Sequence, residues 1–178
     1  SQGYNPKPKM SFGPAIAVGY ESKAEYFEVE FYEYVPIQKI SEVFASNLPD
    51  GFGMVSVKQV PAFFPSLESL AGVLEFSCTA EKIKDADAKI RHFRESAAFE
   101  TSSPPSAKTV KRYDLKQVIR EIKITDGNKI VVLQNLVRNQ YLKPCQLISV
   151  FFNVAAVDVR IMRENFYIIK KDGSLMEL

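Results

Sequence analysis

The fold is decided by the stretch Ile119-Arg-Glu-Ile-Lys-Ile-Thr-Asp-Gly-Asn-Lys-Ile-Val-Val-Leu-Gln-Asn-Leu-Val137. Apolar and β-branched residues fill both of its ends, which is typical of strands. Between them lies Asp126-Gly127-Asn128, and such a turn between two apolar runs is a strong β-hairpin signal. The stretch therefore predicts two antiparallel strands, over 119–125 and 129–137.

The segments around this hairpin extend it into a recurring pattern. A strand is predicted over 73–79, and an amphipathic helix over 81–95, where apolar residues recur at helical spacing. Residues 101–109 have the composition of a loop. Pro144 begins a second helix, and a strand over 159–169 follows. The order is β-α-β-β-α-β, which is the ferredoxin-like pattern.

The first part of the chain has a related order. Residues 10–18 and 25–32 are predicted strands, and in the second of them apolar residues alternate with glutamates. The period then changes to a helical stripe over 36–47, and a strand over 53–60 follows. This β-β-α-β order is the same pattern without its opening β-α. A short helix over 66–71 joins the two parts.

We therefore expect an α+β protein of two tandem ferredoxin-like (βαββαβ) halves, with the first half, 1–65, truncated at its N-terminus and the second over 66–178. The repeat is inferred from element order alone. In a ferredoxin-like sheet the first strand is central, so its absence leaves unpaired backbone groups. We expect either self-association through the first half or an upstream segment that completes it.

Composition limits the class of protein. The chain has 178 residues, of which 46% are hydrophobic and 25% charged, and no run approaches the roughly 18 apolar residues of a membrane-spanning helix. Its beginning has neither the apolar core of a signal peptide nor an initiator Met, so we interpret it as a fragment or a processed chain. Cys78 and Cys145 lie far apart beside apolar residues, which favours reduced thiols. We expect a soluble, cytoplasmic protein without a membrane partner.

Charge is distributed unevenly along the chain. Residues 1–100 hold 10 Lys and Arg against 14 Asp and Glu, whereas residues 101–178 hold 13 against 7. The two parts thus carry −4 and +6. This asymmetry is compatible with an anionic partner, and also with a solvated basic face.

The first candidate binding segment is the loop from Gly3 to Gly13, which combines three prolines with two lysines. Its lysines and backbone amides suit a phosphate or an RNA backbone, and its tyrosine suits base stacking. The alternative is that Pro and Gly only shape the start of a strand. The candidate residues here are Tyr4, Asn5, Lys7 and Lys9.

The second candidate segment runs from Lys108 to Lys123, where basic residues surround a tyrosine. Basic residues interleaved with an aromatic ring suit an anionic strand. A solvated edge beside a flexible loop explains them equally well. The candidate residues here are Lys108, Lys111, Arg112, Tyr113 and Lys116.

Residues for catalysis are scarce. His92 is the only histidine and has no partner for a triad or a metal site, and Glu28 and Glu30 share the polar face of a strand. Two cysteines are too few for an iron–sulfur cluster. Asp114 is expected to cap the turn that follows it. We predict no catalytic residue, no metal ligand and no cofactor in this chain.

A resemblance to a known family rests on the string Ser1-Gln-Gly-Tyr-Asn-Pro-Lys-Pro-Lys-Met-Ser-Phe-Gly-Pro14. Further matching residues follow it, namely Val18-Gly19-Tyr20-Glu21-Ser22, Glu25-Tyr26, Leu48-Pro49-Asp50-Gly51, Val60-Pro61, Ser66-Leu67, Tyr113-Asp114-Leu115 and Lys143-Pro144. Together they resemble the radical-SAM-linked protein family, a bacterial domain of unknown function found alone or fused behind a cobalamin-binding radical SAM enzyme. Members usually carry a strand and a basic helix with a Ser-His-Leu-Asp element before the string, and this chain starts after it.

The resemblance implies a radical SAM enzyme as partner. Our leading hypothesis is an accessory domain that recognises substrate, RNA in particular, for that enzyme. The alternative is a protein–protein docking module that does not touch nucleic acid, favoured by the lack of a recognisable RNA-binding motif. An enzyme in its own right is disfavoured, because no base–nucleophile pair is visible.

Overall fold

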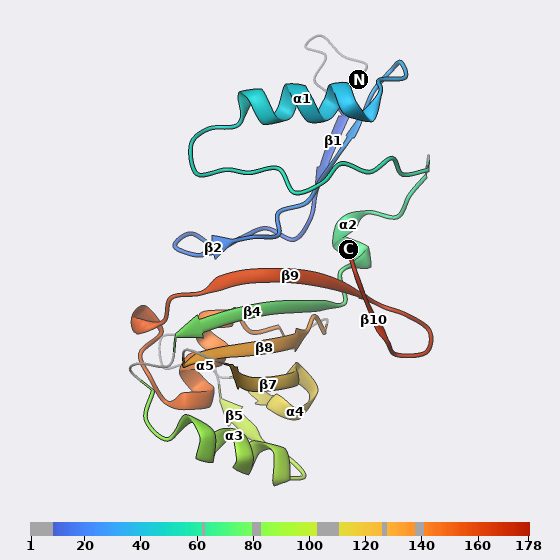
Figure 1. Ribbon diagram of the computed structural model, residues 1–178. Coiled ribbons are helices and arrows are strands. Elements are labelled where there is room, and N and C mark those ends of the chain that lie inside the picture. Colours follow the sequence, from blue (N-terminus) through green and yellow to red (C-terminus); the bar gives the residue numbers. More distant parts are fainter. Residues whose placement is uncertain (1–8, 62, 80–82, 103–110, 126–127, 138–140) are drawn as a thin grey trace.

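The structure is a computed structural model that describes residues 9–61, 63–79, 83–102, 111–125, 128–137 and 141–178 (Figure 1). It is a mixed α+β fold, which confirms the predicted class. A small part near the N-terminus contains one antiparallel pair of strands, β1 (Lys9–Phe12) and β3 (Phe27–Glu30), which we call the N-terminal hairpin, and one helix. A larger part contains a six-stranded sheet. Within the described residues no helix is both long and apolar enough to cross a membrane.

The larger part is built on β4 (Val73–Thr79), β7 (Ile119–Thr125), β8 (Lys129–Asn135) and β9 (Met162–Ile169). Within the sheet these four lie in the order β9-β4-β8-β7, and all neighbours are antiparallel. In chain order this is fourth, first, third, second. The predicted hairpin around Asn128 is confirmed, and Asn128 adopts a left-handed φ of 63°.

Two longer helices connect these strands. They are α3 (Ala86–Glu95) and α5 (Pro144–Phe152), both confirming helices predicted from apolar periodicity. The shorter elements are α2 (Leu67–Leu70), β5 (Glu100–Ser102), β6 (Arg112–Asp114), α4 (Leu115–Val118), the 3-10 helix η1 (Ala156–Asp158) and β10 (Leu175–Glu177). β5 pairs with β6 in a separate two-stranded sheet, and β10 extends the main sheet beside β9.

The hydrophobic core lies between the main sheet and the helices α3 and α5. Phe76 on β4 and Phe166 on β9 are fully buried, as are Leu147 and Ile148 on α5. A ring cluster joins them, with Phe151 packed against Phe93 and Phe99 at centroid distances of 5.4 and 5.5 Å. Burial of this many large apolar side chains makes the larger part the main source of stability.

The smaller part consists of β1 (Lys9–Phe12), β3 (Phe27–Glu30) and α1 (Ile37–Asn47). The two strands form an antiparallel pair in which Met10 faces Val29 and Phe12 faces Phe27. These four residues share the face that α1 covers, where Phe44 lies 5.4 Å from the Phe27 ring. The helix nevertheless has no buried residue.

Two strand predictions in this part need correction. The strand expected over 10–18 ends at Phe12, because Gly13-Pro14 follows and proline cannot donate to a ladder. The strand expected over 53–60 is not present. Its alternating valines have no ladder partner, since β1 and β3 pair only with each other in the described chain.

Residues 13–26, which we call the strap, connect the two parts. Its strand β2 (Glu21–Ser22) runs parallel to β9, with the Glu21 amide donating to the Ile161 carbonyl at 3.0 Å. Buried Arg163 donates to the Pro14 and Ala15 carbonyls at 3.0 and 2.8 Å and to the Glu25 carboxylate at 2.7 Å. The strap thus covers the part of the β9 edge that β10 leaves free.

Candidate functional site

Four of the nine candidate residues from sequence analysis lie outside the described residues. They are Tyr4, Asn5, Lys7 and Lys108. The remaining candidates are placed, and the structure does not gather them. Lys9 lies on β1, which Figure 1 shows at the opposite end of the molecule from β5, the partner of the strand that carries Arg112. Lys9 also forms an exposed ion pair with Glu30.

The second candidate segment is partly buried. Lys111 and Arg112 are exposed, but Tyr113 is only 8% exposed and belongs to the hydrophobic core. Its ring therefore does not fit the predicted stacking role, because alternation along β6 turns it inward. Lys116 is half-buried, with its ammonium 4.4 Å from the Phe93 ring centroid and 3.2 Å from the Arg94 carbonyl.

Asp114 does what the sequence predicts. Its side chain accepts a hydrogen bond from the Lys116 amide at 3.0 Å and caps α4. The same oxygen lies 3.4 Å from the Phe99 amide, and Gln117 donates to the other oxygen at 3.3 Å. The role of Asp114 is thus local and structural.

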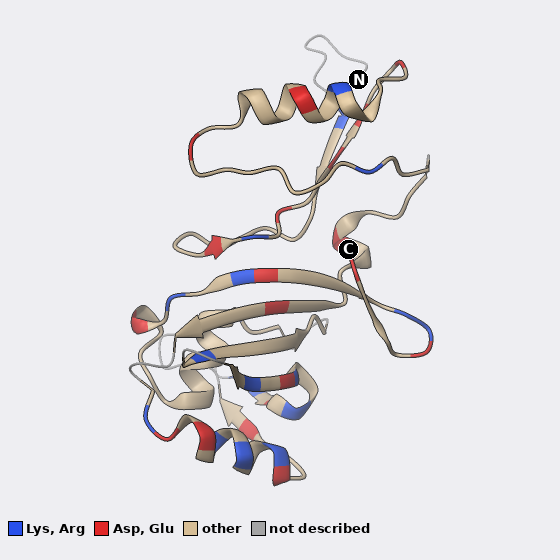
Figure 2. Ribbon diagram, in the orientation of Figure 1, with Lys and Arg blue, Asp and Glu red and all other residues tan. Residues whose placement is uncertain are grey.

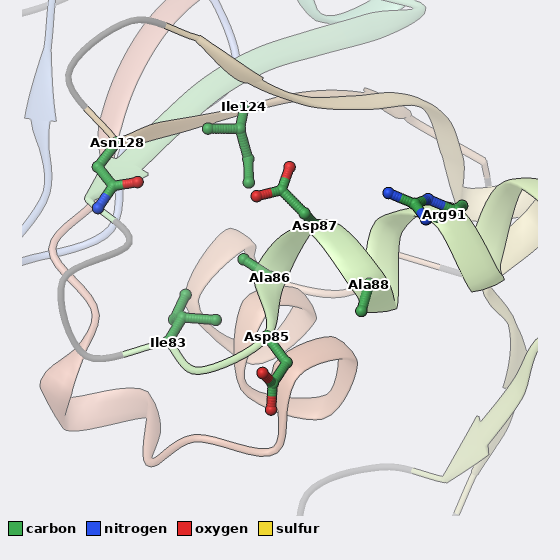
Figure 3. Close-up of a pocket in the computed structure, with 8 residues that line it drawn as sticks. All are labelled: Ile83, Asp85, Ala86, Asp87, Ala88, Arg91, Ile124 and Asn128. Atoms are coloured by element: carbon green, nitrogen blue, oxygen red, sulfur yellow. The ribbon is translucent and has the colours of Figure 1, made fainter.

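A groove lined by charged residues lies between α3 and the edge strand β7. It consists of two adjoining hollows of about 410 and 220 Å³, which share Asp87, Arg91 and Ile124 (Figure 3). Figure 3 shows Asp87 and Arg91 on the side of α3 that faces Ile124. Arg94 and Lys123 line the smaller hollow. We call this the α3–β7 groove.

The side chains of the groove are suited to binding an anion rather than to catalysis. Three cations, Arg91, Arg94 and Lys123, line the groove together with two carboxylates, Asp85 and Asp87. Figure 2 shows basic and acidic residues together along α3. Part of this charge is engaged, because Arg94 donates to the Ile122 carbonyl at 2.8 Å and Lys123 pairs with Glu121 at 3.1 Å. Guanidinium groups bind phosphates in pairs of hydrogen bonds, so a modest electrostatic site results.

Sequence reasoning missed the two arginines of the groove. Positions 87, 91 and 94 are separated by four and three residues, which places them on one face of a helix. That spacing is the signal that could have found them. His92 lies outside this face and is exposed, with its ring 5.9 Å from Phe99.

The sheet face opposite the helices holds a charged cluster. Ser77 alternates with buried Phe76, so it lies on that opposite face together with Glu164. Glu164 accepts hydrogen bonds from Lys129 at 2.5 Å, from Ser77 at 2.6 Å and from Lys23 of the strap at 2.8 Å. Burial alone would raise the pKa of Glu164, but these three donors lower it to about 2. The carboxylate is held ionised and cannot act as a general acid.

The two cysteines are free, as predicted. Burial raises the pKa of the Cys78 thiol to about 12, so it stays protonated and is a poor nucleophile. Cys145 is half-buried, and its backbone amide donates to the Tyr20 hydroxyl at 3.0 Å. The Cys78 thiol thus lacks the environment of a reactive cysteine.

Large apolar side chains are exposed mainly in the smaller part of the molecule. Of the eighteen that are exposed in the described chain, thirteen belong to residues 9–64. They are Met10, Phe12, Val18, Phe27, Phe31, Tyr32, Tyr34, Val43, Phe52, Val55, Val60, Phe63 and Phe64. Such a concentration of exposed apolar residues marks a protein interaction surface in many proteins.

A family described as "Uncharacterized protein conserved in bacteria (DUF2344)" matches residues 1–144 of the chain. No curated protein and no solved structure matches it.

Proposed function

The chain belongs to this family of uncharacterised bacterial proteins, and we propose that it is a binding module that docks on a partner enzyme through residues 9–64. The partner that we propose is a radical SAM enzyme, because that is the enzyme class implied by the resemblance of the opening string. We place both in the cytoplasm, which agrees with the two free thiols.

The observation that carries the docking proposal is the exposure of apolar side chains in residues 9–64. Tyr32, Tyr34 and Phe52 are 84, 79 and 69% exposed. Aromatic side chains of this kind supply most of the binding energy in the centre of protein interfaces. Leaving so many of them in water is unfavourable, and a partner surface would remove that cost.

The larger part provides the scaffold for this surface. We propose that residues 66–178 form one ferredoxin-like unit, supported by the strand order β9-β4-β8-β7 and by the two helices on one face. We keep residues 1–65 as a second, incomplete unit of the same kind. The N-terminal hairpin and α1 support this assignment, whereas residues 53–60 do not.

The docking proposal is tested by copurification from bacterial cells. The full chain is tagged, and bound proteins are identified by mass spectrometry. We expect a radical SAM enzyme with a Cys-x3-Cys-x2-Cys motif, and we expect at least a tenfold loss of it with Tyr32→Ser, Phe52→Ser. A matched control is Val157→Ser, Met176→Ser, which removes two exposed apolar residues from the larger part.

Three results would overturn the docking proposal. One is the absence of a radical SAM enzyme from the bound proteins. A second is retention of the enzyme by the Tyr32→Ser, Phe52→Ser chain. The third is an equal loss with both pairs of substitutions, which would indicate a general effect on folding. Circular dichroism of each purified variant checks that the fold persists.

RNA recognition is a second candidate function, and the α3–β7 groove favours it. The groove brings Arg91 and Arg94 beside Lys123, the last residue of the second candidate segment, 108–123. Lys116 of the same segment lies next to Arg94. The charges of such a groove can follow a phosphate backbone without reading its sequence. In this form the module would hold substrate for the enzyme to which it docks.

A further inference from the structure

We propose that the outer edge of β3 receives a β-strand of the partner protein, a strand in which apolar residues alternate with lysine or arginine. This inference rests on the proposed docking function and specifies its contact. The free backbone edge, the apolar face beneath α1 and the acidic face of the N-terminal hairpin each support it.

The backbone of β3 has hydrogen-bonding groups that point away from β1. The two strands form a separate two-stranded sheet, so each has one free edge within the described chain. The Gly13 amide donates to the Tyr26 carbonyl at 2.9 Å, which places a bonded pair at that position. Bonded pairs alternate along an antiparallel ladder, so the amides and carbonyls of Phe27 and Val29 point outward.

The apolar face of the N-terminal hairpin is only partly covered by α1. Phe12 and Phe27 remain 65 and 44% exposed, although Phe44 packs on Phe27. Val43 of α1 is 52% exposed. A two-stranded sheet is marginally stable in water, and a third strand would place new apolar side chains under the helix beside these residues.

The opposite face of β3 is acidic and has an unmet hydrogen-bond acceptor. Glu28 accepts from the Ser11 hydroxyl at 2.6 Å through one oxygen. The other oxygen, Oε1, is buried and receives no hydrogen bond from the described residues. Residues 9–65 hold four lysines, no arginine and seven Asp and Glu, a net charge of −3. A basic side chain on an added strand complements this face across the pair.

The charge pattern selects β3 rather than β1. Both acidic residues of the N-terminal hairpin, Glu28 and Glu30, lie on β3, whereas β1 presents Lys9 and Ser11 on that face. A basic strand beside β1 would face Lys9 at close range, and like charges directly opposite destabilise a pair. The same strand beside β3 meets two carboxylates, of which Glu30 is also paired with Lys9 and Glu28 has an oxygen that receives no hydrogen bond from the described residues.

The test uses three synthetic nine-residue peptides and the full chain. One alternates valine with lysine, one has glutamate for each lysine, and one repeats the lysine peptide with alternate backbone amides N-methylated. We expect the lysine peptide to bind at least tenfold more tightly than either of the others, measured by fluorescence anisotropy at 50 mM salt. The N-methylated peptide keeps every charge and side chain, so its loss of binding identifies backbone pairing.

Variants of the chain then identify the edge. Val29→Pro removes an outward amide of β3, and Met10→Pro removes one of β1, both at positions where an edge strand tolerates proline. We expect at least a tenfold loss for Val29→Pro and less than a twofold change for Met10→Pro. The double variant Glu28→Lys, Glu30→Lys should prefer the glutamate peptide.

Equal binding of the lysine and glutamate peptides, or undiminished binding of the N-methylated peptide, overturns the inference even if the proline variants unfold. The peptide result is independent of copurification. Peptide binding without enzyme copurification leaves the edge site in place and removes the proposed enzyme partner. Enzyme copurification without peptide binding retains docking and removes the edge site.

Discussion

Residues 9–64 and residues 66–178 differ sharply in how much they bury. Among the described residues of the first range, Ala24 alone is buried, whereas the second range contains every other buried side chain. Yet both ranges contain regular helices and strands predicted from their periodicity. Helices and strands can therefore form in a range that has almost no buried side chains of its own. A hairpin and one helix can form and still depend on contacts with their surroundings.

The largest expected difference between the two ranges is in how much a Phe→Ala substitution lowers the free energy of unfolding. Phe76→Ala in the sheet should lower the free energy of unfolding by about 3–5 kcal/mol, because it leaves a cavity among fully buried neighbours. Phe12→Ala, at a site that is 65% exposed, should cost less than about 1 kcal/mol. Urea denaturation followed by circular dichroism measures both. Similar costs would show that the small part has a core of its own.

The strap offers a sharper test, because it joins the two ranges. Arg163→Met removes three hydrogen bonds to Pro14, Ala15 and Glu25, which should destabilise the strap locally by about 2–3 kcal/mol. Hydrogen exchange of the Glu21 and Lys23 amides, which donate to the Ile161 and Arg163 carbonyls, should then become about 30- to 150-fold faster.

Two controls bound that effect on the strap. Amides of β8 should keep their exchange rates, and Lys23→Ala should change little, since the side chain that it removes is 60% exposed. Unchanged exchange at Glu21 in the Arg163→Met chain would show that the strap is held by other contacts.

The two ranges also differ in charge, and nucleic-acid binding should follow that difference. We expect a single-stranded oligouridine of twelve nucleotides to bind weakly, and more weakly still between 50 and 200 mM salt. Arg91→Ala, Arg94→Ala should reduce affinity about tenfold, which is about 1.4 kcal/mol. Lys39→Ala, Lys58→Ala, in the acidic range, is the matched control. Affinities are measured by fluorescence anisotropy. An affinity that changes neither with salt nor with the two arginine substitutions would exclude the groove as an RNA site.

The smallest expected effect concerns pH. The pKa of Glu164 is about 2 in the folded protein and about 4.5 ordinarily, so the unfolded chain binds the proton more readily. Its stabilising contribution is complete above pH 4.5 and is lost as pH falls from 4.5 to 2. Because Lys23 and Lys129 are substantially exposed, we expect on the order of 1 kcal/mol. Unfolding free energies of the wild type and of Glu164→Gln, measured between pH 6 and 2.5, should converge. Parallel curves would remove Glu164 from the pH response.

The β7–β8 hairpin and the long helices could be predicted because their sequence signals are local. Asp126-Gly127-Asn128 separates two apolar runs, and α1, α3 and α5 repeat apolar residues at helical spacing. The cap at Asp114 is equally local. The strap could not be predicted in this way, because β2 has only two residues and its partner β9 lies about 140 residues away. The strand prediction over 53–60 was wrong for the converse reason. Its residues alternate as in a strand, but in the described chain no neighbouring strand pairs with them.

The candidate site was predictable only in part. A run of basic residues indicates a charged surface but does not show which single residue turns inward, and the candidate binding residue Tyr113 is a core residue. Arg91 and Arg94 became notable only when α3 was placed against β7. The exposed aromatic residues of 9–64 gave no sign of their exposure in the sequence, because Phe and Tyr are usually buried.

The pairing of β2 with β9 has a consequence for how the protein is made. A ribosome completes the strap about 140 residues before it completes the strand to which the strap binds. Throughout that interval residues 9–64 emerge without their anchor, and their aromatic side chains are available to chaperones or to other nascent chains. Such a long separation in sequence also slows spontaneous closure after refolding from denaturant. The exposed surface that we propose for docking is thus also where premature association is most to be expected during synthesis.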